Sequence, residues 1–338
     1  TAFPAGDCRT SLGLTDVTDD QVNAFISEFD GNIYPKESKA FSAPPALDGA
    51  DSVLGDMLGD PQLYKVTAAQ ADDTVVLVDN VRDANFYDPT SPDGQTFIAG
   101  FFYSTFNDYT NHNIMTIDAF DWLHRTGANP PDNSNDPAYV ACAAELNYGR
   151  GMGKPRARDY EGTFAHEYQH LLESYASPGE TSWVNEGLSD YAQTLVGYVD
   201  TSLPPTDPNF DSHIACFEGF LPESYGGAEN SLTLWEDQGG PEVLCDYGAA
   251  YTFMQYTRDQ FGAKFMSRLH NEDLDGMEGY NKVLSSIGSS RTAMSVMKDW
   301  AAAMALDAVL DKGSSLTGGS KRKFSAKSAL PVEAGAEV

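Results

Sequence analysis

The sequence predicts an α+β protein, in which a small mixed sheet near the N-terminus packs on a mainly helical remainder. Three apolar runs, at residues 74–81, 96–104 and 113–120, are rich in Val, Ile, Phe and Thr and are bounded by turn residues, which is typical of strands. From about residue 158 onward, apolar residues recur with the period of a helix. A strand-rich first part followed by a helical second part predicts this fold class.

The same change of character predicts two subdomains and a tail. We expect residues 1–150 to form the sheet-containing subdomain and residues 151–312 the helical subdomain, with an active-site cleft between them. The stretch 313–338 begins with a run rich in Gly, Ser and Lys, a composition typical of linkers, and predicts a flexible tail. A chain of 338 residues is long enough to bury a sizeable core.

One helix is predicted before the strands, in "TDDQVNAFISEFDGNIY" (residues 18–34). Thr18 or Asp19 is expected to provide its N-cap. Its apolar stripe is expected to consist of Val22, Phe25, Ile26 and Phe29.

Four helices are predicted in the second part of the chain. They cover residues 159–176, a stretch that begins near Ser182, residues 247–262 and residues 291–310. The intervening residues 200–245 are interrupted by Pro, Gly and Asp, so we expect an extended excursion over the surface there.

The charge of the chain argues against two classes of partner. Lys and Arg number 21 against 50 Asp and Glu, a net charge of −29, and such a field repels nucleic acid and anionic membrane surfaces. No run of 18 apolar residues is present, so no membrane span is expected. The start, Thr1-Ala2-Phe3, is interpreted as an end left by processing rather than an initiation site.

The four cysteines predict disulfides rather than a cysteine metal site. Cys8, Cys142, Cys216 and Cys245 show no CxxC spacing. An even count fits two disulfides in a secreted protein, and we favour the pair Cys216–Cys245 because these two bracket one loop-rich stretch. The alternative is four free buried thiols in a cytosolic protein.

A metal site is predicted in "FAHEYQHLLESYASPGETSWVNEGLSDYAQ" (residues 164–193). On a helix over 159–176, His166 and His170 lie about 40° apart, so both imidazoles can bind one ion. Glu167 lies about 100° from His166, beside the metal, where a general base for a water molecule belongs. The opposite face of the helix is apolar, and carries Phe164, Tyr168, Leu171 and Tyr175.

Glu186 is the predicted third ligand. A metzincin ligand set fails, because Glu173 and Ala176 stand where Gly and His would be needed. The turn at Pro178-Gly179 allows a second helix on which Glu186 and Asp190 share a face. We expect Glu186 to bind the ion and Asp190 to accept the outer N–H of a liganding histidine.

The remaining polar candidates of this region are expected to play lesser roles. Glu173 is expected to be solvated or to support the ligands from outside the metal's coordination sphere. The other histidines, which are His112, His124, His213 and His270, are expected at the surface or in the core.

These motifs resemble those of the gluzincin metallopeptidases. "HEYQH" followed by "WVNEGLSDYAQ" is similar to the thermolysin type, and the combination of Phe-Ala-His-Glu-x-Gln-His with Trp-x-Asn-Glu-Gly-Leu-Ser looks closest to the hyicolysin-like secreted bacterial peptidases. The match covers about 30 residues. The gap between His170 and Glu186 is shorter than in the thermolysin type, so its loop geometry does not carry over.

The resemblance implies a zinc peptidase with a group that stabilises the oxyanion. In "CDYGAAYTFMQYTRDQFG", Tyr247 occupies the matching position, and Tyr251 is its rival. The alternative for Tyr247 is a core tyrosine beside Cys245.

The expected function is that of a secreted, extracellular zinc-dependent metalloendopeptidase, with proteins or peptides as substrates. An aminopeptidase is the first alternative, but no GxMEN-like segment for a substrate ammonium precedes the HExxH motif. The second alternative is a non-catalytic surface or matrix module with structural zinc, which needs a fourth protein ligand such as His213.

A calcium site is a weaker expectation. Aspartates at 79, 83, 88 and 93 invite a calcium-loop interpretation, but their spacing matches no EF-hand. Ordinary turn aspartates are favoured over Ca²⁺ ligands.

Overall fold

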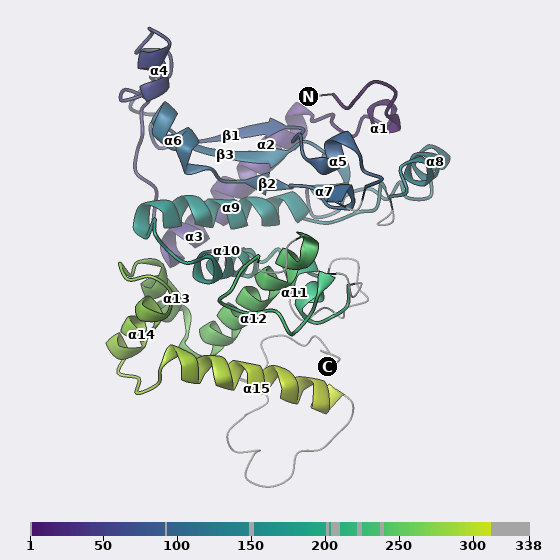
Figure 1. Cartoon of the computed structure of the whole chain (residues 1–338). Coiled ribbons are helices and arrows are strands. Elements are labelled where there is room, and N and C mark those ends of the chain that lie inside the picture. Colours follow the sequence, from purple (N-terminus) through teal and green to yellow (C-terminus); the bar gives the residue numbers. More distant parts are fainter. Residues whose placement is uncertain are drawn as a thin grey trace. The chain divides into compact units, whose positions relative to one another are not determined.

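The computed structural model describes residues 2–91, 93–148, 152–200, 203, 210–221, 225–236 and 240–311, with side chains up to residue 306. The predicted tail and part of the predicted surface excursion lie outside these residues. The fold is of the α+β class with a small mixed sheet, as predicted (Figure 1).

The chain divides into two compact units. The first comprises the chain up to Pro35 and Ala43–Leu171, and the second comprises Lys36–Ser42 and the chain from Leu172 onward. Two borders fall within helices α3 (Tyr34–Ala40) and α9 (Asp159–Ala176), and the third lies after α3, between Ser42 and Ala43. The limits predicted for the sheet-containing subdomain (1–150) and the helical subdomain (151–312) stay predictions.

The first unit holds the sheet and mostly short helices. Its other elements are α1 (Cys8–Ser11), α2 (Asp19–Glu28), the π-helical turn η1 (Phe29–Ile33), α4 (Val53–Met57), β1 (Thr74–Asp79), α5 (Ala84–Tyr87), the 3-10 turn η2 (Asp93–Gln95), β2 (Gly100–Phe101), α6 (Ser104–Thr110), β3 (Asn113–Asp118), α7 (Trp122–Arg125) and α8 (Pro137–Glu145).

The second unit is helical in its described residues. Its elements are α10 (Ser182–Val196), α11 (Ser212–Phe217), the 3-10 turn η4 (Gly240–Glu242), α12 (Val243–Phe261), α13 (Ala263–His270), α14 (Gly276–Ser286) and α15 (Ala293–Asp311). The four helices predicted after residue 158 are found as α9, α10, α12 and α15. Helices α11, α13 and α14 were not anticipated.

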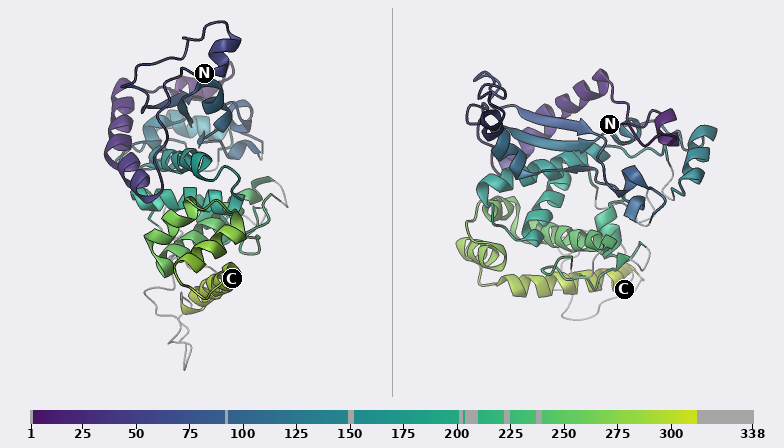
Figure 2. Two further views of the ribbon diagram at one scale, coloured as in Figure 1. Left: turned by 90° about the vertical axis from the view of Figure 1, so that its left-hand side faces the viewer. Right: turned by 45° about the horizontal axis from the view of Figure 1, so that its top comes forward.

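The sheet has the strand order β1-β3-β2, and the views of Figure 2 show the strands side by side. Strand β1 pairs in parallel with β3, Thr74 opposite Asn113, and β2 pairs antiparallel with β3, Gly100 opposite Ile117. All residues of the central strand β3 are buried. The three predicted strand positions are therefore confirmed.

Strand β2 is much shorter than the predicted 96–104, because backbone N–H groups on both sides of it donate to side chains rather than to a neighbouring strand. The N–H of Ile98 donates to the side chain of Asp83 (2.7 Å), and the N–H of Phe102 donates to Glu167 Oε2 (2.8 Å). An added Cβ at Gly100 would lie 2.9 Å from Thr163 of α9, so the absence of a side chain lets β2 lie directly on that helix.

Helix α2 begins where predicted, with Thr18 as its N-cap in a capping box with Gln21. The predicted apolar stripe is half correct. Phe25 and Phe29 pack edge-on against Phe164, with ring centroids 5.2 Å away in both cases. Val22 and Ile26 are exposed instead, because only the side of α2 that faces α9 is covered.

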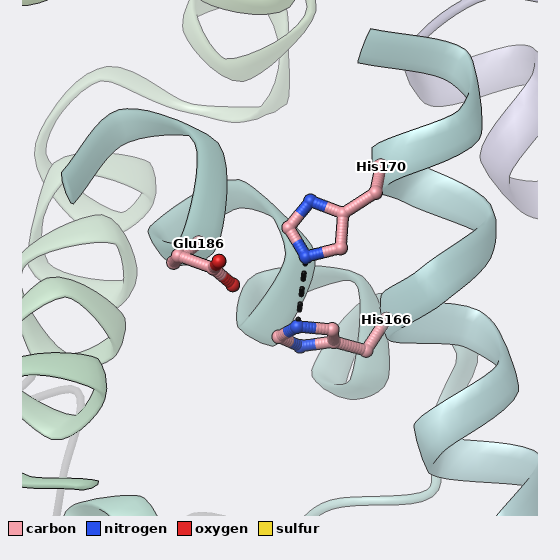
Figure 3. A group of neighbouring side chains, drawn as sticks. All are labelled: His166, His170 and Glu186. Carbon is pink, nitrogen blue, oxygen red and sulfur yellow. Dashed lines mark hydrogen bonds between the residues drawn. The ribbon is translucent and has the colours of Figure 1, made fainter. Parts of the chain in front are cut away.

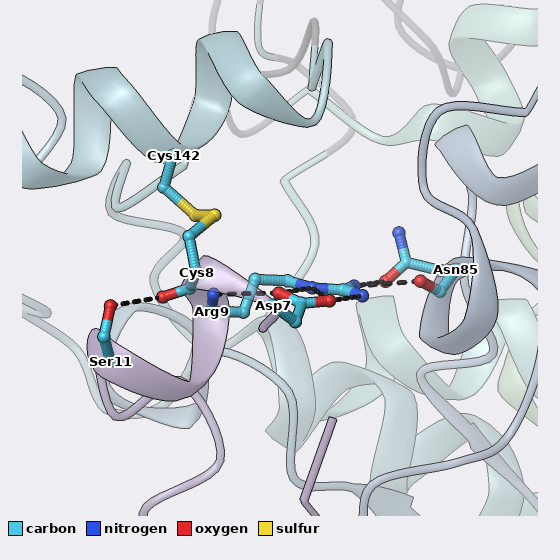
Figure 4. The surroundings of a disulfide bond; sticks show 6 residues. All are labelled: Asp7, Cys8, Arg9, Ser11, Asn85 and Cys142. Atoms are coloured by element: carbon cyan, nitrogen blue, oxygen red, sulfur yellow. Dashed lines mark hydrogen bonds and ion pairs between the residues drawn. A yellow bond between two sulfur atoms is a disulfide. The ribbon is translucent and has the colours of Figure 1, made fainter. Parts of the chain in front are cut away.

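Two disulfides are present, and the described residues contain no free cysteine. Cys216–Cys245 confirms the favoured pair and links α11 to α12, with Cα atoms 4.7 Å apart. Cys8–Cys142 joins α1 to α8 (Figure 4). Next to Cys8, the buried Arg9 side chain donates to Asp7 and Asn85, which fixes the N-terminal segment. Two disulfides fit an extracellular protein.

In the described part of the chain, no helix combines the length and the apolar character needed to cross a lipid bilayer.

Asp118, at the end of β3, makes the stability of the fold depend on pH. Burial raises the pKa of its carboxyl group to about 7, although the N–H groups of Phe120 and Val81 donate to it. The folded state therefore holds this proton more tightly than the unfolded state. The stability that the proton contributes is fully present below the ordinary pKa near 3.8 and is lost as the pH rises through about 7.

We therefore expect Asp118→Asn to be more stable than the wild type at pH 8, by about 1–4 kcal/mol, with the difference shrinking toward pH 4. The asparagine keeps an acceptor oxygen for the two backbone donors. Urea unfolding at both pH values measures the effect. Asp56→Asn at the exposed Asp56 is the control and should show no such gain. A gain of equal size at both pH values would contradict the assignment.

Candidate metal centre

Helix α9 brings two imidazoles together. His166 and His170 are one turn apart, and their Nε2 atoms are 3.0 Å from each other (Figure 3). The rings are nearly perpendicular, with an interplanar angle of 80°. Phe164 and Tyr168 are fully buried on the opposite side of the helix, so burial of that side fixes which way the histidines point.

Glu186 completes the group, as predicted. The chain leaves α9 at Ala176, turns at Pro178-Gly179 and begins α10 at Ser182. The ligand atoms of His166, His170 and Glu186 all lie within 4.8 Å of one another, and Figure 3 shows the carboxylate directed toward the imidazoles. In the part of the chain that the structure describes, no other group of this kind occurs.

The geometry of the group fits a metal ion. Ligand atoms in a tetrahedral zinc site lie about 3.3–3.5 Å apart, close to the 3.0 Å between the two Nε2 atoms. His166 is buried, and His170 and Glu186 are half-buried. Two imidazoles and a carboxylate suit transition metals, whereas calcium and magnesium prefer oxygen ligands alone.

Glu167, the predicted general base, is held by the sheet. Its Oε2 accepts a hydrogen bond from the N–H of Phe102, directly after β2, at 2.8 Å. A hydrogen bond to a carboxylate is stronger than one between neutral groups, and it restricts the carboxylate to one orientation. This contribution of Phe102 could not be predicted from the sequence, because a backbone donor leaves no side-chain signature.

The position of α10 depends on a close helix contact. A Cβ added at Gly187 would lie 2.8 Å from Met254 and 3.1 Å from the carbonyl oxygen of Ala250, both on α12. Only glycine permits this approach next to Glu186. Residues Gly187 to Ala192 are buried, so α10 presents Glu186 from a packed element rather than from a loop.

Asp190 connects Glu186's helix to a histidine that the sequence had placed at the surface or in the core. The fully buried Asp190 contacts Nδ1 of His213 at 2.9 Å and accepts a hydrogen bond from Gln193. Asp211 caps α11 and places His213 there. Burial raises the pKa of Asp211 despite the nearby His213. A bond from Asp190 to a liganding imidazole stays a prediction.

His213 stacks on Tyr247. Their ring centroids are 4.6 Å apart, with an interplanar angle of 27°, and Trp235 packs edge-on against Tyr247 at 5.0 Å. The close approach of α11 and α12 requires Gly248, where an added Cβ would lie 2.1 Å from the carbonyl oxygen of His213. Asp190, His213 and Tyr247 are thus in contact one after another, through a hydrogen bond and a ring stack.

The rival tyrosine has a different environment. Tyr251 is fully buried, and its hydroxyl group bonds to Thr194 Oγ1 at 2.5 Å. Burial raises the pKa of Tyr251 well above its ordinary value. Tyr247 is half-buried, so of the two tyrosines it is the one accessible to a substrate.

Glu173 corrects one expectation, since it is not solvated. It is fully buried and contacts Nδ1 of His270, which is also fully buried. His112 and His124 are core histidines, as expected, and bond to Tyr64 and Asp121 respectively.

Two of the four aspartates considered for a calcium loop bond to groups in their own turns. Asp83 caps α5 through the N–H of Phe86, and Asp88 accepts from the N–H and the hydroxyl of Thr90. These are the turn roles that were favoured.

The chain matches no protein family model, and no curated protein sequence is significantly similar to it. Any assignment of function therefore depends on the residues themselves.

Proposed function

We propose that the protein is a zinc-dependent metallopeptidase that cleaves peptide bonds within protein substrates. The observation that carries the proposal is the group of His166, His170 and Glu186, with Glu167 on the same helix as the two imidazoles. The pattern matches the three protein ligands that a catalytic zinc ion takes while one position stays open.

The roles of the residues follow from their chemistry. When bound, zinc supplies Lewis-acid chemistry, polarising the scissile carbonyl group and making a water molecule more acidic. Glu167 takes a proton from the attacking water and then delivers it to the nitrogen of the departing amine. The N–H of Phe102 keeps the Glu167 carboxylate in one orientation during both transfers.

Tyr247 and His213 are assigned to the developing negative charge. The Tyr247 hydroxyl group can donate a hydrogen bond to an oxyanion, whereas His213, whose Nδ1–H faces Asp190, donates from Nε2 only when both ring nitrogens are protonated. The stacking of the two rings keeps these groups together. Asp190 orients the His213 ring through Nδ1, so Nε2 is the ring nitrogen that does not face Asp190.

Two alternatives are less well supported. A structural zinc site requires a fourth protein ligand. In the described residues, His213 does not belong to the metal group, which consists of His166, His170 and Glu186, and it contacts Asp190 instead. An aminopeptidase requires an acidic clamp for the substrate ammonium, and no motif for one precedes the HExxH motif. Secretion is proposed on the two disulfides and the acidic composition.

The test combines metal analysis with a peptidase assay. We expect one zinc ion per chain, casein cleavage that 1,10-phenanthroline abolishes, and recovery when zinc is restored. A peptide blocked at its N-terminus should still be cut, and loss of cutting would identify an exopeptidase. A pure, zinc-loaded protein that cleaves neither casein nor blocked and free peptides would overturn the proposal.

The two tyrosines offer a matched pair of variants. Tyr247→Phe should lower kcat by about 10²- to 10³-fold with zinc content unchanged, because one donor to the oxyanion is lost. Tyr251→Phe should leave kcat unchanged and lower the free energy of unfolding by about 1 kcal/mol, because its buried hydroxyl group bonds to Thr194 and Gln255 within the core. Steady-state kinetics and urea unfolding measure both. Wild-type kcat in Tyr247→Phe would remove Tyr247 from the site.

A further inference from the structure

A second set of nucleophile, imidazole and carboxylate lies within the second unit, in residues that are not part of the metal group. The hydroxyl oxygen of Ser42 is 2.8 Å from Nε2 of His270. On the other side of the same ring, Nδ1 contacts Oε2 of Glu173. The three groups come from the segment after α3, from the last residue of α13 and from α9, so only the tertiary fold assembles them.

The protonation of the ring follows from the order of the three groups. An ionised carboxylate only accepts hydrogen bonds, so Nδ1 of His270 carries a hydrogen toward Glu173. In the neutral imidazole, Nε2 then has a lone pair directed at Ser42, and the hydroxyl group donates to it. This is the arrangement in which a histidine acts as general base toward a serine while a carboxylate fixes its tautomer.

Glu173, His270 and Ser42 differ in burial, and the order suits a serine that is activated by a histidine. Glu173 and His270 are fully buried, which keeps water from competing for the ring. Ser42 is half-buried and precedes the exposed Ala43, so it is the member of the three that lies nearest to solvent. The ring of Phe41 packs on His270 with centroids 5.1 Å apart, and Asn271 donates to the Phe41 carbonyl at 3.1 Å, which together hold the segment in place.

We propose that Ser42 is a nucleophile for acyl transfer from short esters, in a reaction separate from the metal centre. A bond forms between Ser42 Oγ and the ester carbonyl carbon, and the bond from that carbon to the alcohol oxygen breaks. The hydroxyl proton passes to Nε2 of His270 and then to the departing alcohol. Water removes the acyl group by the reverse sequence, with His270 again as the base.

A fluorophosphonate probe tests the nucleophile directly, because Ser42 Oγ bonds to phosphorus and fluoride leaves. We expect one label per chain, mapped to Ser42 by mass spectrometry, at the same rate with and without a zinc chelator. The label should form about 100-fold faster than on Ser91, which is also half-buried but whose hydroxyl group donates to the Asp88 carbonyl. p-Nitrophenyl acetate should acylate the same serine.

Variants separate a reactive serine from a structural network. Ser42→Ala should abolish labelling and Ser91→Ala should not. His270→Gln should slow labelling about 100-fold, and Glu173→Gln should slow it as well. Circular dichroism and thermal unfolding verify that each variant is folded. Mapping the fluorophosphonate label on the wild-type protein needs no variant. It therefore tests whether Ser42 is reactive even if a substitution at a buried residue prevents folding.

Two results would overturn the proposal. Labelling of Ser42 no faster than that of Ser91 would mean that the three groups only hold the segment before Ala43 in place. Labelling that disappears with the chelator would assign the reaction to the metal centre. Neither result bears on casein cleavage, so the peptidase proposal is tested independently.

Discussion

Replacement of Glu167 by glutamine should lower casein and peptide turnover by about 10²- to 10⁴-fold while leaving one zinc ion per chain. The glutamine cannot accept the proton of the attacking water, so the proton transfer on which the reaction depends is lost. Its amide oxygen can still accept the hydrogen bond from Phe102, so the local fold is expected to remain. Steady-state kinetics, with zinc measured on the same sample, gives both quantities.

The matched control is Glu278→Gln, the same chemical change at an exposed position on α14. It should leave turnover and zinc content unchanged. Near-full activity in Glu167→Gln would remove this residue from the mechanism, whereas loss of zinc would place it among the ligands.

Replacement of Glu186 by glutamine should release the metal. A neutral amide oxygen is a weaker ligand than a carboxylate, and the two imidazoles alone leave a catalytic zinc site incomplete. We expect zinc affinity to fall by more than about 100-fold, beyond the range typical of residues outside the coordination sphere, and activity to fall with it. Competition against a chelator of known affinity measures the change.

Asp190→Asn, one turn later on α10, is the comparison for Glu186. Its charge supports His213 and, by the sequence-based prediction, a liganding imidazole. A loss of zinc affinity of about 10- to 100-fold is expected, with slower turnover. Unchanged affinity and rate in Asp190→Asn would mean that this carboxylate only stabilises α11. Unchanged affinity in Glu186→Gln would contradict the ligand set itself.

The metal group was predictable because it depends on short-range geometry. His166 and His170 share a face of any helix that covers them, and the turn at Pro178-Gly179 leaves few positions for Glu186. The N-cap at Thr18 was likewise local, since its partner Gln21 is three residues away. The disulfide Cys216–Cys245 was predicted because these two cysteines bracket one loop-rich stretch, and the structure contains this disulfide.

The sequence by itself therefore determined helices α2, α9, α10, α12 and α15, the strand positions and the three side chains that could hold a metal ion, because apolar periodicity and contacts within about one turn set them. Only the tertiary structure decided what surrounds the site. Phe102 reaches Glu167 across 65 residues and His213 reaches Asp190 across 23, and no local pattern encodes such contacts. Burial of Glu173 likewise depends on His270, a residue of another helix. Which face of a helix is covered, and which donor a carboxylate meets, follows from the packing of distant segments.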